Sequence, residues 1–271
     1  MKCSMVMVRW GVGVILCSIL ACCNPMDILV SQEEEAISET EAWQETVDEI
    51  RKMTRGQKIP AHLIEPEQPE EGDVFDPSQL LVPLDHLSLK PGYMLDFVYR
   101  YDGMGGRPIL YAREESAAPY ANLEDYRNAL GTEDVPYNAH LEFLESDGTP
   151  EGYFQWILMQ MMGGQFYLYW HSGYDDDEII ASRAYLETLT ERMISTEFGV
   201  PFSSSQKNQA LKINPAPIVT IEDDQVTVRV VYFTLWGGFY EKITTLTRTA
   251  PHTVINTETH QLVEYECGIQ F

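Results

Sequence analysis

The densest group of residues that could do chemistry lies at 171–178 and reads HSGYDDDE. His171 can exchange protons near neutral pH, and Asp175 and Asp177 can act as general acids or bases. These three are the candidate catalytic residues of a hydrolase. The same two aspartates and their acidic neighbours could instead cap the start of a helix, where backbone N–H groups lack partners. We expect capping to be their main role.

The segment after this acidic group is predicted to be a helix over about 176–195. Its apolar residues share one helical face: Ile179, Leu186, Leu189 and Met193. A shorter helix is predicted earlier, in the segment NLEDYRNALG, with Asn122 as its N-cap and Gly131 at its end.

Three stretches place a Gly-Gly pair between two aromatic or β-branched runs, at 97–113, 155–171 and 228–244. Paired glycines supply the positive φ angles that tight turns need, so each stretch is predicted to be a β-hairpin. The expected fold class is therefore α+β, with an antiparallel β-sheet built from hairpins and a few packing helices.

The second of these hairpins is apolar on both of its predicted faces. Its large side chains are candidate ligand-binding residues: Trp156, Met159, Met161, Tyr167, Tyr169 and Trp170. They would line an apolar groove if no helix covered that face of the sheet. The alternative, which we favour, is that they are core residues, because large apolar side chains in strands are usually buried.

The N-terminus has the pattern of a secretory signal. Lys2 and Arg9 are its only charges before Asp27, and an apolar or small run follows from Trp10 to Ala21. This run is shorter than the about 20 apolar residues that a helix needs to span a bilayer. We expect residues 1–21 to be removed as a signal peptide.

Residues Ile19, Leu20, Ala21 and Cys22 resemble the lipobox of bacterial lipoproteins. The resemblance covers only the first two dozen residues. It implies cleavage before a lipid-modified cysteine, Cys22 or, one place along, Cys23. Such a lipid would anchor the exported chain to the cell membrane with its domain outside the cytoplasm. An ordinary cleaved signal is the alternative.

The rest of the chain divides by composition. Ser31 and Glu34 fit a capping box, and Trp43 lies in an apolar stripe that could dock on the chain's own domain or on a partner protein. Prolines and glutamates then predict an extended linker. The expected parts are a tether over 22–30, an amphipathic helix over 31–56, a linker over 57–82 and one α+β domain over 83–271.

Composition excludes several function classes. A formal net charge of −24 repels phosphate backbones, so we expect no nucleic-acid partner. No metal-binding or cofactor-binding motif is present, and we predict neither a metal nor a cofactor. Cys267 is the one cysteine beyond the N-terminal segment, and its place in an alternating apolar pattern predicts a buried thiol.

Together these features favour an extracytoplasmic lipoprotein that binds a protein partner or an apolar ligand and is not an enzyme. Two alternatives remain. One is the exported hydrolase described above, acting on cell-wall or glycan material. The other is a structural subunit of a cell-envelope complex, with the helix that carries Trp43 as its docking element.

Overall fold

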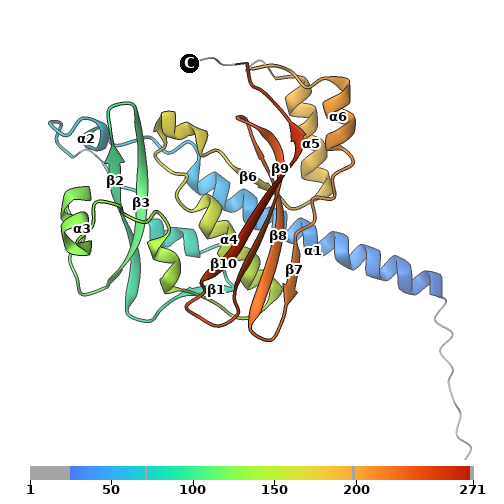
Figure 1. Cartoon of the computed structure of the whole chain (residues 1–271), viewed down its shortest axis with the longest axis horizontal. Helices are drawn as coiled ribbons and strands as arrows, with labels where there is room; N and C mark the ends of the chain where they lie inside the picture. The colour runs from blue at the N-terminus through green and yellow to red at the C-terminus, as the bar shows by residue number, and fades with distance from the viewer. Residues whose placement is uncertain (1–24, 71, 197–198, 269–271) are drawn as a thin grey trace, which may run out of the picture. The chain divides into compact units, whose positions relative to one another are not determined.

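The computed structural model describes residues 25–70, 72–196 and 199–268 (Figure 1). The predicted signal peptide and both candidate lipid-attachment cysteines, Cys22 and Cys23, lie outside these residues. Residues Ile37–Phe271 form one compact unit. Within the described part of the chain, no helix is both long and apolar enough to cross a membrane.

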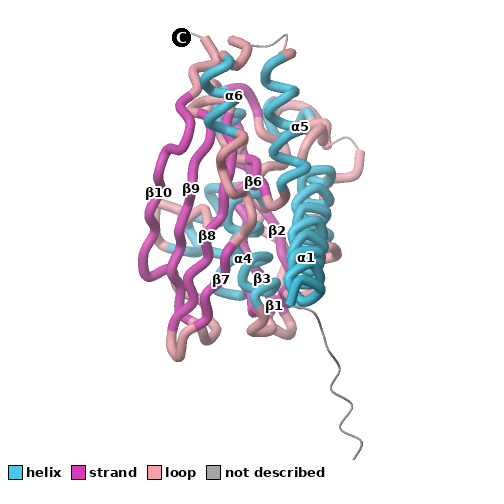
Figure 2. The backbone as a smooth tube through the Cα atoms, turned by 90° about the vertical axis from the view of Figure 1, so that its right-hand side faces the viewer, coloured by secondary structure: helices cyan, strands magenta, loops and turns pink. Residues whose placement is uncertain are grey.

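The fold is α+β, as predicted, and its larger sheet has five antiparallel strands (Figure 2). Strand β8 pairs with β9 along one edge, and β9 pairs with β10. The other edge of β8 pairs with two short strands, β6 and β7. The strand bounds are β6 Glu178–Ile180, β7 Ile218–Ile221, β8 Gln225–Thr234, β9 Gly238–Thr247 and β10 Val254–Glu264.

A second antiparallel sheet contains β2 (Tyr93–Tyr101), β3 (Gly105–Glu114) and β5 (Tyr169–Trp170). A two-stranded ladder joins β1 (Leu87–Leu89) to β4 (Leu144–Ser146). The first and third predicted hairpins are confirmed, because β2 pairs with β3 and β8 pairs with β9 across their glycine-containing turns.

The second predicted hairpin is wrong, because its first arm is helix α4 (Pro150–Met162). The hydroxyl of Thr149 accepts a hydrogen bond from the backbone N–H of Gly152, and Pro150 stands in the first turn, where its missing N–H costs nothing. Leucine, methionine and glutamine then favour the helix. Gly163 ends it instead of forming a strand turn.

Helix α4 is apolar on all sides because it is buried on all sides. It lies between the two sheets and packs on strands β7 and β8 (Figure 1). Its buried residues make up much of the main core: Tyr153, Phe154, Trp156, Ile157, Leu158, Met159 and Met162. The segment with apolar residues at nearly every position, and no strand or helical periodicity, is therefore the one at the centre of this domain.

Helix α1 spans Pro25–Thr54, so it begins six residues before the predicted start and ends two residues before the predicted end. Its side chains Trp43, Val47 and Ile50 are buried in the main core, and the Trp43 ring stacks on Phe154 with 4.8 Å between ring centroids. The prediction that this stripe docks on the chain's own domain is confirmed. The envelope-subunit hypothesis therefore loses its proposed docking element.

Residues 57–82, which we expected to form an extended linker, belong to the compact unit. They contain a short helix α2 (Ala61–Ile64) and a 3-10 turn η1 (Pro77–Leu81). Leu80 is fully buried, and Phe75 packs on the main core. The apolar residues between the prolines bury enough surface to hold this segment against the domain.

The helix predicted over 176–195 begins later than expected, as α5 (Arg183–Ile194). Ser182 is its N-cap and accepts a hydrogen bond from the backbone N–H of Tyr185. The prediction that the acidic group caps this helix is therefore wrong. The short helix α3 (Leu123–Leu130) is confirmed with Asn122 as its cap, helix α6 spans Ser204–Ala210, and the thiol of Cys267 is buried.

Candidate ligand-binding pocket

The acidic group at 175–178 follows the 3-10 turn η3 (His171–Tyr174) and leads directly into strand β6, whose first residue is Glu178. Asp175 and Asp177 line one pocket, whereas Asp176 and Glu178 bond to other elements of the fold. The four carboxylates therefore have separate partners, although they are adjacent in the sequence.

Two of the four carboxylates have structural roles. Asp176 accepts hydrogen bonds from the hydroxyl of Thr234 and from the backbone N–H of Leu235, in the turn between β8 and β9. Glu178 is 3% exposed and accepts hydrogen bonds from Arg51 and Arg55 of the α1 region. These two residues fasten the acidic segment to the sheet and to the N-terminal helix.

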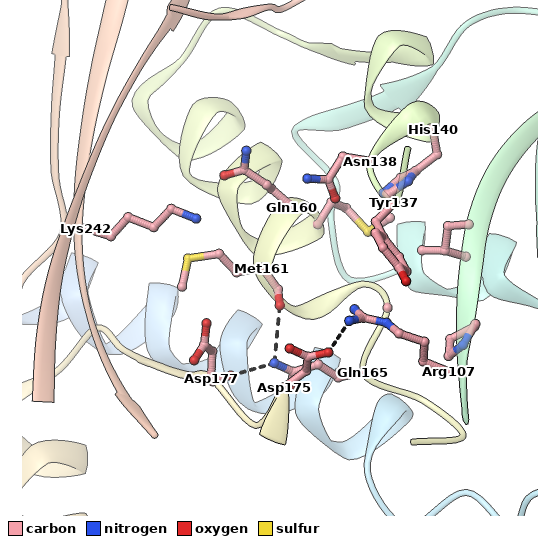
Figure 3. Close-up of a pocket in the computed structure, with 14 residues that line it drawn as sticks. Arg107, Tyr137, Asn138, His140, Gln160, Met161, Gln165, Asp175, Asp177 and Lys242 are labelled. Carbon is pink, nitrogen blue, oxygen red and sulfur yellow. Dashed lines mark hydrogen bonds and ion pairs between the residues drawn. The ribbon is translucent and has the colours of Figure 1, made fainter. Parts of the chain in front are cut away.

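The other two carboxylates line a pocket with a volume of about 260 Å³ (Figure 3). Its walls come from the C-terminal end of α4, from β3, from β9, from the acidic segment and from the residues that lead into the 3-10 turn η2 (Ala139–Phe143). Its polar lining includes Arg107, Gln160, Gln165, Asp175, Asp177 and Lys242.

Asp177 and Lys242 face the pocket from two elements that are far apart in the sequence (Figure 3). Burial, together with the nearby charge of Asp176, raises the pKa of Asp177 to about 6, against the opposing effect of Lys242. Burial also lowers the pKa of Lys242. Both shifts arise because a charge loses hydration inside the protein. Among the described residues, neither side chain has a hydrogen-bond or ion-pair partner within 4.0 Å.

Arg107 and Asp175 form an ion pair at the opposite wall. The Arg107 guanidinium also lies over the ring of Tyr137, 4.5 Å from the ring centroid. The pocket thus holds two acidic and two basic side chains, although the whole chain carries a net charge of −24. Its local charge is balanced.

Gln165 fixes the geometry of this pocket. Its side-chain Nε2 donates to the backbone oxygen of Met161 at 3.2 Å and to that of Asp177 at 2.8 Å (Figure 3). It therefore ties the end of α4 to the acidic segment. The Oε1 atoms of Gln160 and Gln165 are buried and have no hydrogen-bond partner in the part of the chain that the structure describes. Such acceptors favour a ligand that donates hydrogen bonds.

His140 supplies an uncharged wall of the pocket. It is 2% exposed, and burial lowers its pKa to about 4, with a smaller opposing effect from the backbone of Leu110. The imidazole is therefore neutral at pH 7 and adds no positive charge to the site.

The structure separates the three candidate catalytic residues. Asp175 and Asp177 line the pocket, whereas His171 lies in a neighbouring hollow that shares the Arg107 and Asp175 wall. The Nδ1 atom of His171 shares a hydrogen bond of 2.9 Å with the hydroxyl of Tyr174. The arrangement therefore does not assemble His171 and the two aspartates in one site.

The six candidate apolar ligand-binding residues lie in three places. Trp156 and Tyr167 are buried in the core. Met159 and Met161 line the polar pocket from α4. The third pair, Tyr169 and Trp170, forms β5, where Trp170 is 62% exposed. They do not form one apolar groove, because Trp156, Met159 and Met161 are distributed around the axis of α4 and the other three residues lie beyond the end of this helix.

Several pocket residues were not singled out from the sequence: Arg107, Tyr137, Gln160, Gln165 and Lys242. One of them had a detectable signal. Lys242, Thr244 and Leu246 share one face of β9, because every second side chain of a strand points the same way. Thr244 and Leu246 are buried, so Lys242 places a charged residue on the inward face of the strand. The other residues come together only through the tertiary fold.

Searches against protein-family models, curated proteins and solved structures found no significant match to this chain.

Proposed function

We propose that this protein is a lipid-anchored, extracytoplasmic module that binds a small zwitterionic solute, of about the size of an amino acid, in the pocket between α4, β3 and β9. The observation that carries the binding proposal is the pair of opposite charges on Asp177 and Lys242, which line one pocket and attract each other without a direct hydrogen bond or ion pair. The anchor is supported by the lipobox-like sequence that ends at Cys22 or Cys23.

The charge balance of the pocket supports a ligand of both signs. Arg107 and Asp175 already neutralise each other. Asp177 can accept hydrogen bonds from a ligand ammonium group, and Lys242 can donate to a ligand carboxylate. A ligand with one charge would desolvate the other half-buried protein charge without pairing it, which costs free energy. A ligand with both charges pairs each of them.

The size and lining of the pocket support a small polar molecule over an apolar one. Its volume of about 260 Å³ lies slightly below the range of about 300–1,000 Å³ that is usual for drug-sized ligands. Its charged groups and the two buried amide oxygens supply polar partners on several sides. This changes the ligand class that the sequence favoured, because the apolar residues are mostly used in the core.

Thermal unfolding of the full chain with a panel of α-amino acids tests the binding proposal. Acetate and ethylammonium, which carry one charge each, are the matched ligand controls. A solute at 100 times its Kd adds about 2.7 kcal/mol to the free energy of unfolding, so the melting temperature rises measurably. We expect a shift with at least one amino acid and none with either control.

Two pocket variants show whether such a shift arises at this site. Asp177→Asn and Lys242→Met remove one charge each, and Asp223→Asn and Lys212→Met change exposed residues outside the pocket. Loss of the ligand shift in the first pair and its retention in the second supports the proposal. A shift that persists in both pocket variants contradicts it.

The anchor has its own test. Intact-mass analysis of the chain from cells that produce it should show a new N-terminus at Cys22 or Cys23 with added acyl mass. An uncleaved leader or a terminus without acyl mass would refute this half of the proposal and leave the pocket untouched.

A second candidate function, the exported hydrolase, keeps one favourable observation. The pKa of Asp177, raised to about 6, suits a general acid at near-neutral pH. The neighbouring Asp175 is paired with Arg107, so it is a poor base or nucleophile. Turnover of a cell-wall or glycan substrate that is lost in Asp177→Asn would favour this function over simple binding.

A further inference from the structure

Strand β10 is the outer edge of the five-stranded sheet (Figure 2). Its only paired neighbour among the described strands is β9. Side chains 254–261 are all exposed, and the ladder with β9 is regular from Asn256 to Gln261. Edge strands are commonly protected by lysine, proline or β-bulges, and the middle of β10, from Asn256 to Gln261, has none of these. The edge is open to another strand.

The hydrogen bonds at both ends of β9 show which backbone groups point toward β10. The carbonyl of Gly237 accepts from the N–H of Tyr265, and the N–H of Thr247 donates to the carbonyl of Thr253. Backbone directions alternate along an antiparallel strand. The odd-numbered residues of β9 therefore direct their N–H and C=O groups toward β10.

The register then fixes the direction of each backbone group of β10. Ile243 is opposite Glu258, and Glu241 is opposite His260, so Glu258 and His260 bond to β9. Thr259 lies between them and must direct its N–H and C=O away from the sheet. The same alternation directs the backbone of Thr257 outward.

We propose that β10 is a homodimer interface, in which a second copy of this chain pairs its own β10 antiparallel to the first, with Thr259 opposite Thr259 on the twofold axis. This register makes hydrogen bonds between outward-facing backbone groups. It also places Glu258 of each copy opposite His260 of the other, which gives two identical side-chain pairs of complementary chemistry.

The charges of Glu258 and His260 favour this register over registers shifted by one residue in either direction. A dimer centred one residue earlier places Glu258 opposite Glu258, and like charges directly opposite each other are destabilising. A dimer centred one residue later places two copies of His260 together and loses both glutamate pairs. The ladder has irregularities between Val254 and Asn256 and between Gln261 and Val263, which confine regular pairing to the middle of the strand.

The high net charge does not prevent this pairing. Both copies carry −24, but exposed charges more than about 8 Å apart are largely screened at physiological ionic strength. At the centre of the interface, each copy contributes the side chains of Glu258, Thr259 and His260. We therefore expect association to weaken when salt is removed, because long-range repulsion then increases.

Cysteine cross-linking of the full chain in detergent tests the register. Residues opposite each other in a hydrogen-bonded antiparallel pair have Cα atoms about 5.5 Å apart, within reach of a disulfide. Thr259→Cys should therefore give a disulfide-linked dimer under mild oxidation. Thr257→Cys is the matched control, because its two copies would lie about 14 Å apart along the strands.

A mixed experiment adds a second readout. Thr257→Cys and Gln261→Cys produced in the same cells should cross-link to each other, because these positions are opposite in the proposed register. Neither should cross-link with itself. The unmodified chain gives the background level of cross-linking. The proposal would be overturned if Thr257→Cys cross-linked as well as Thr259→Cys, if Glu258→Cys gave the predominant dimer, or if no variant cross-linked.

Two further variants in the mixed experiment test the contacts. Thr259→Pro removes an outward N–H and leaves the ladder with β9 intact, so it should abolish the cross-link without unfolding the chain. His260→Glu places acid opposite acid and should reduce cross-linking at least about threefold, and Glu258→Lys added to it should restore cross-linking. Cross-linking unchanged by Thr259→Pro would contradict strand pairing.

Discussion

The guanidinium of Arg51 on α1 donates a hydrogen bond of 2.7 Å to the carboxylate of Glu178 on β6, across 127 positions of sequence. Arg55 donates to the second oxygen of the same carboxylate at 2.7 Å, and Tyr185 of α5 donates to the first. One buried glutamate therefore connects the N-terminal helix, the large sheet and α5. This connection also holds the neighbouring Asp177 in the pocket.

Replacement of this glutamate by Glu178→Gln should destabilise the domain by about 1.5–3 kcal/mol, because it removes the buried carboxylate that accepts charged hydrogen bonds from the half-buried Arg51 and the more exposed Arg55. Chemical denaturation followed by circular dichroism measures the change. Glu187→Gln, on the exposed side of α5, is the matched control and should change stability by less than about 0.5 kcal/mol. Equal effects of the two variants would contradict the role of Glu178.

The pH dependence of this variant has a defined sign. Burial would raise the pKa of Glu178, but Arg55, the Tyr185 hydrogen bond and two further arginines hold it below its ordinary value. Its ionised form therefore stabilises the fold above the ordinary pKa of 4.5, and the contribution is lost as pH falls through the lowered value. The difference in the free energy of unfolding between the unmodified chain and Glu178→Gln should therefore become smaller as the pH is lowered below 4.5.

The docking of α1 can be measured through Trp43. This side chain is 7% exposed and stacks on Phe154, so Trp43→Ala should leave a cavity and cost about 3–5 kcal/mol. Trp170→Ala removes the same side chain from a position that is 62% exposed and should cost much less. Thermal unfolding distinguishes the two. A negligible effect of Trp43→Ala would mean that α1 does not stabilise the domain.

The half-buried carboxylate of Asp177 predicts an unusual pH profile of stability. Its pKa is raised from 3.8 to about 6, so the folded chain binds more protons than the unfolded chain between these values. The unmodified chain should therefore lose stability relative to Asp177→Asn as pH rises from about 4 to about 6, by about 1–2 kcal/mol. Asp223→Asn, at an exposed turn, is the control. A stability difference between the unmodified chain and Asp177→Asn that did not change with pH would contradict the raised pKa of Asp177.

The glycine pairs make different demands on the backbone. Gly238 has φ of +98°, and an added Cβ would lie 2.1 Å from the backbone oxygen of Val263. Gly238→Ala should therefore cost more than about 2 kcal/mol. Gly164 has no atom within 4 Å of an added Cβ, so Gly164→Ala should be within about 0.5 kcal/mol of neutral. Melting temperatures of the two variants test this difference.

Much of the fold could be predicted because its signals are local. Glycines between β-branched or aromatic runs indicate β2–β3 and β8–β9, although Gly103 and not the Gly105–Gly106 pair supplies the positive φ of the first turn. Asn122 specifies the start of α3. The helix α4 was mistaken for a strand because it is buried on all sides, so its apolar residues show no helical period. The signals that could have corrected this were Thr149 and Pro150, which together mark a helix start.

The site shows the limit of sequence reasoning more clearly. The residue types alone indicated that the acidic group at 175–178 was chemically important, that nucleic acid was an unsuitable partner, and that the N-terminus resembled a lipoprotein signal. Only the tertiary structure decided that Asp177 faces Lys242 while Glu178 is fastened to Arg51. Adjacent side chains of the acidic group have different partners, and each partner comes from an element that is distant in the sequence, so no local pattern could indicate it.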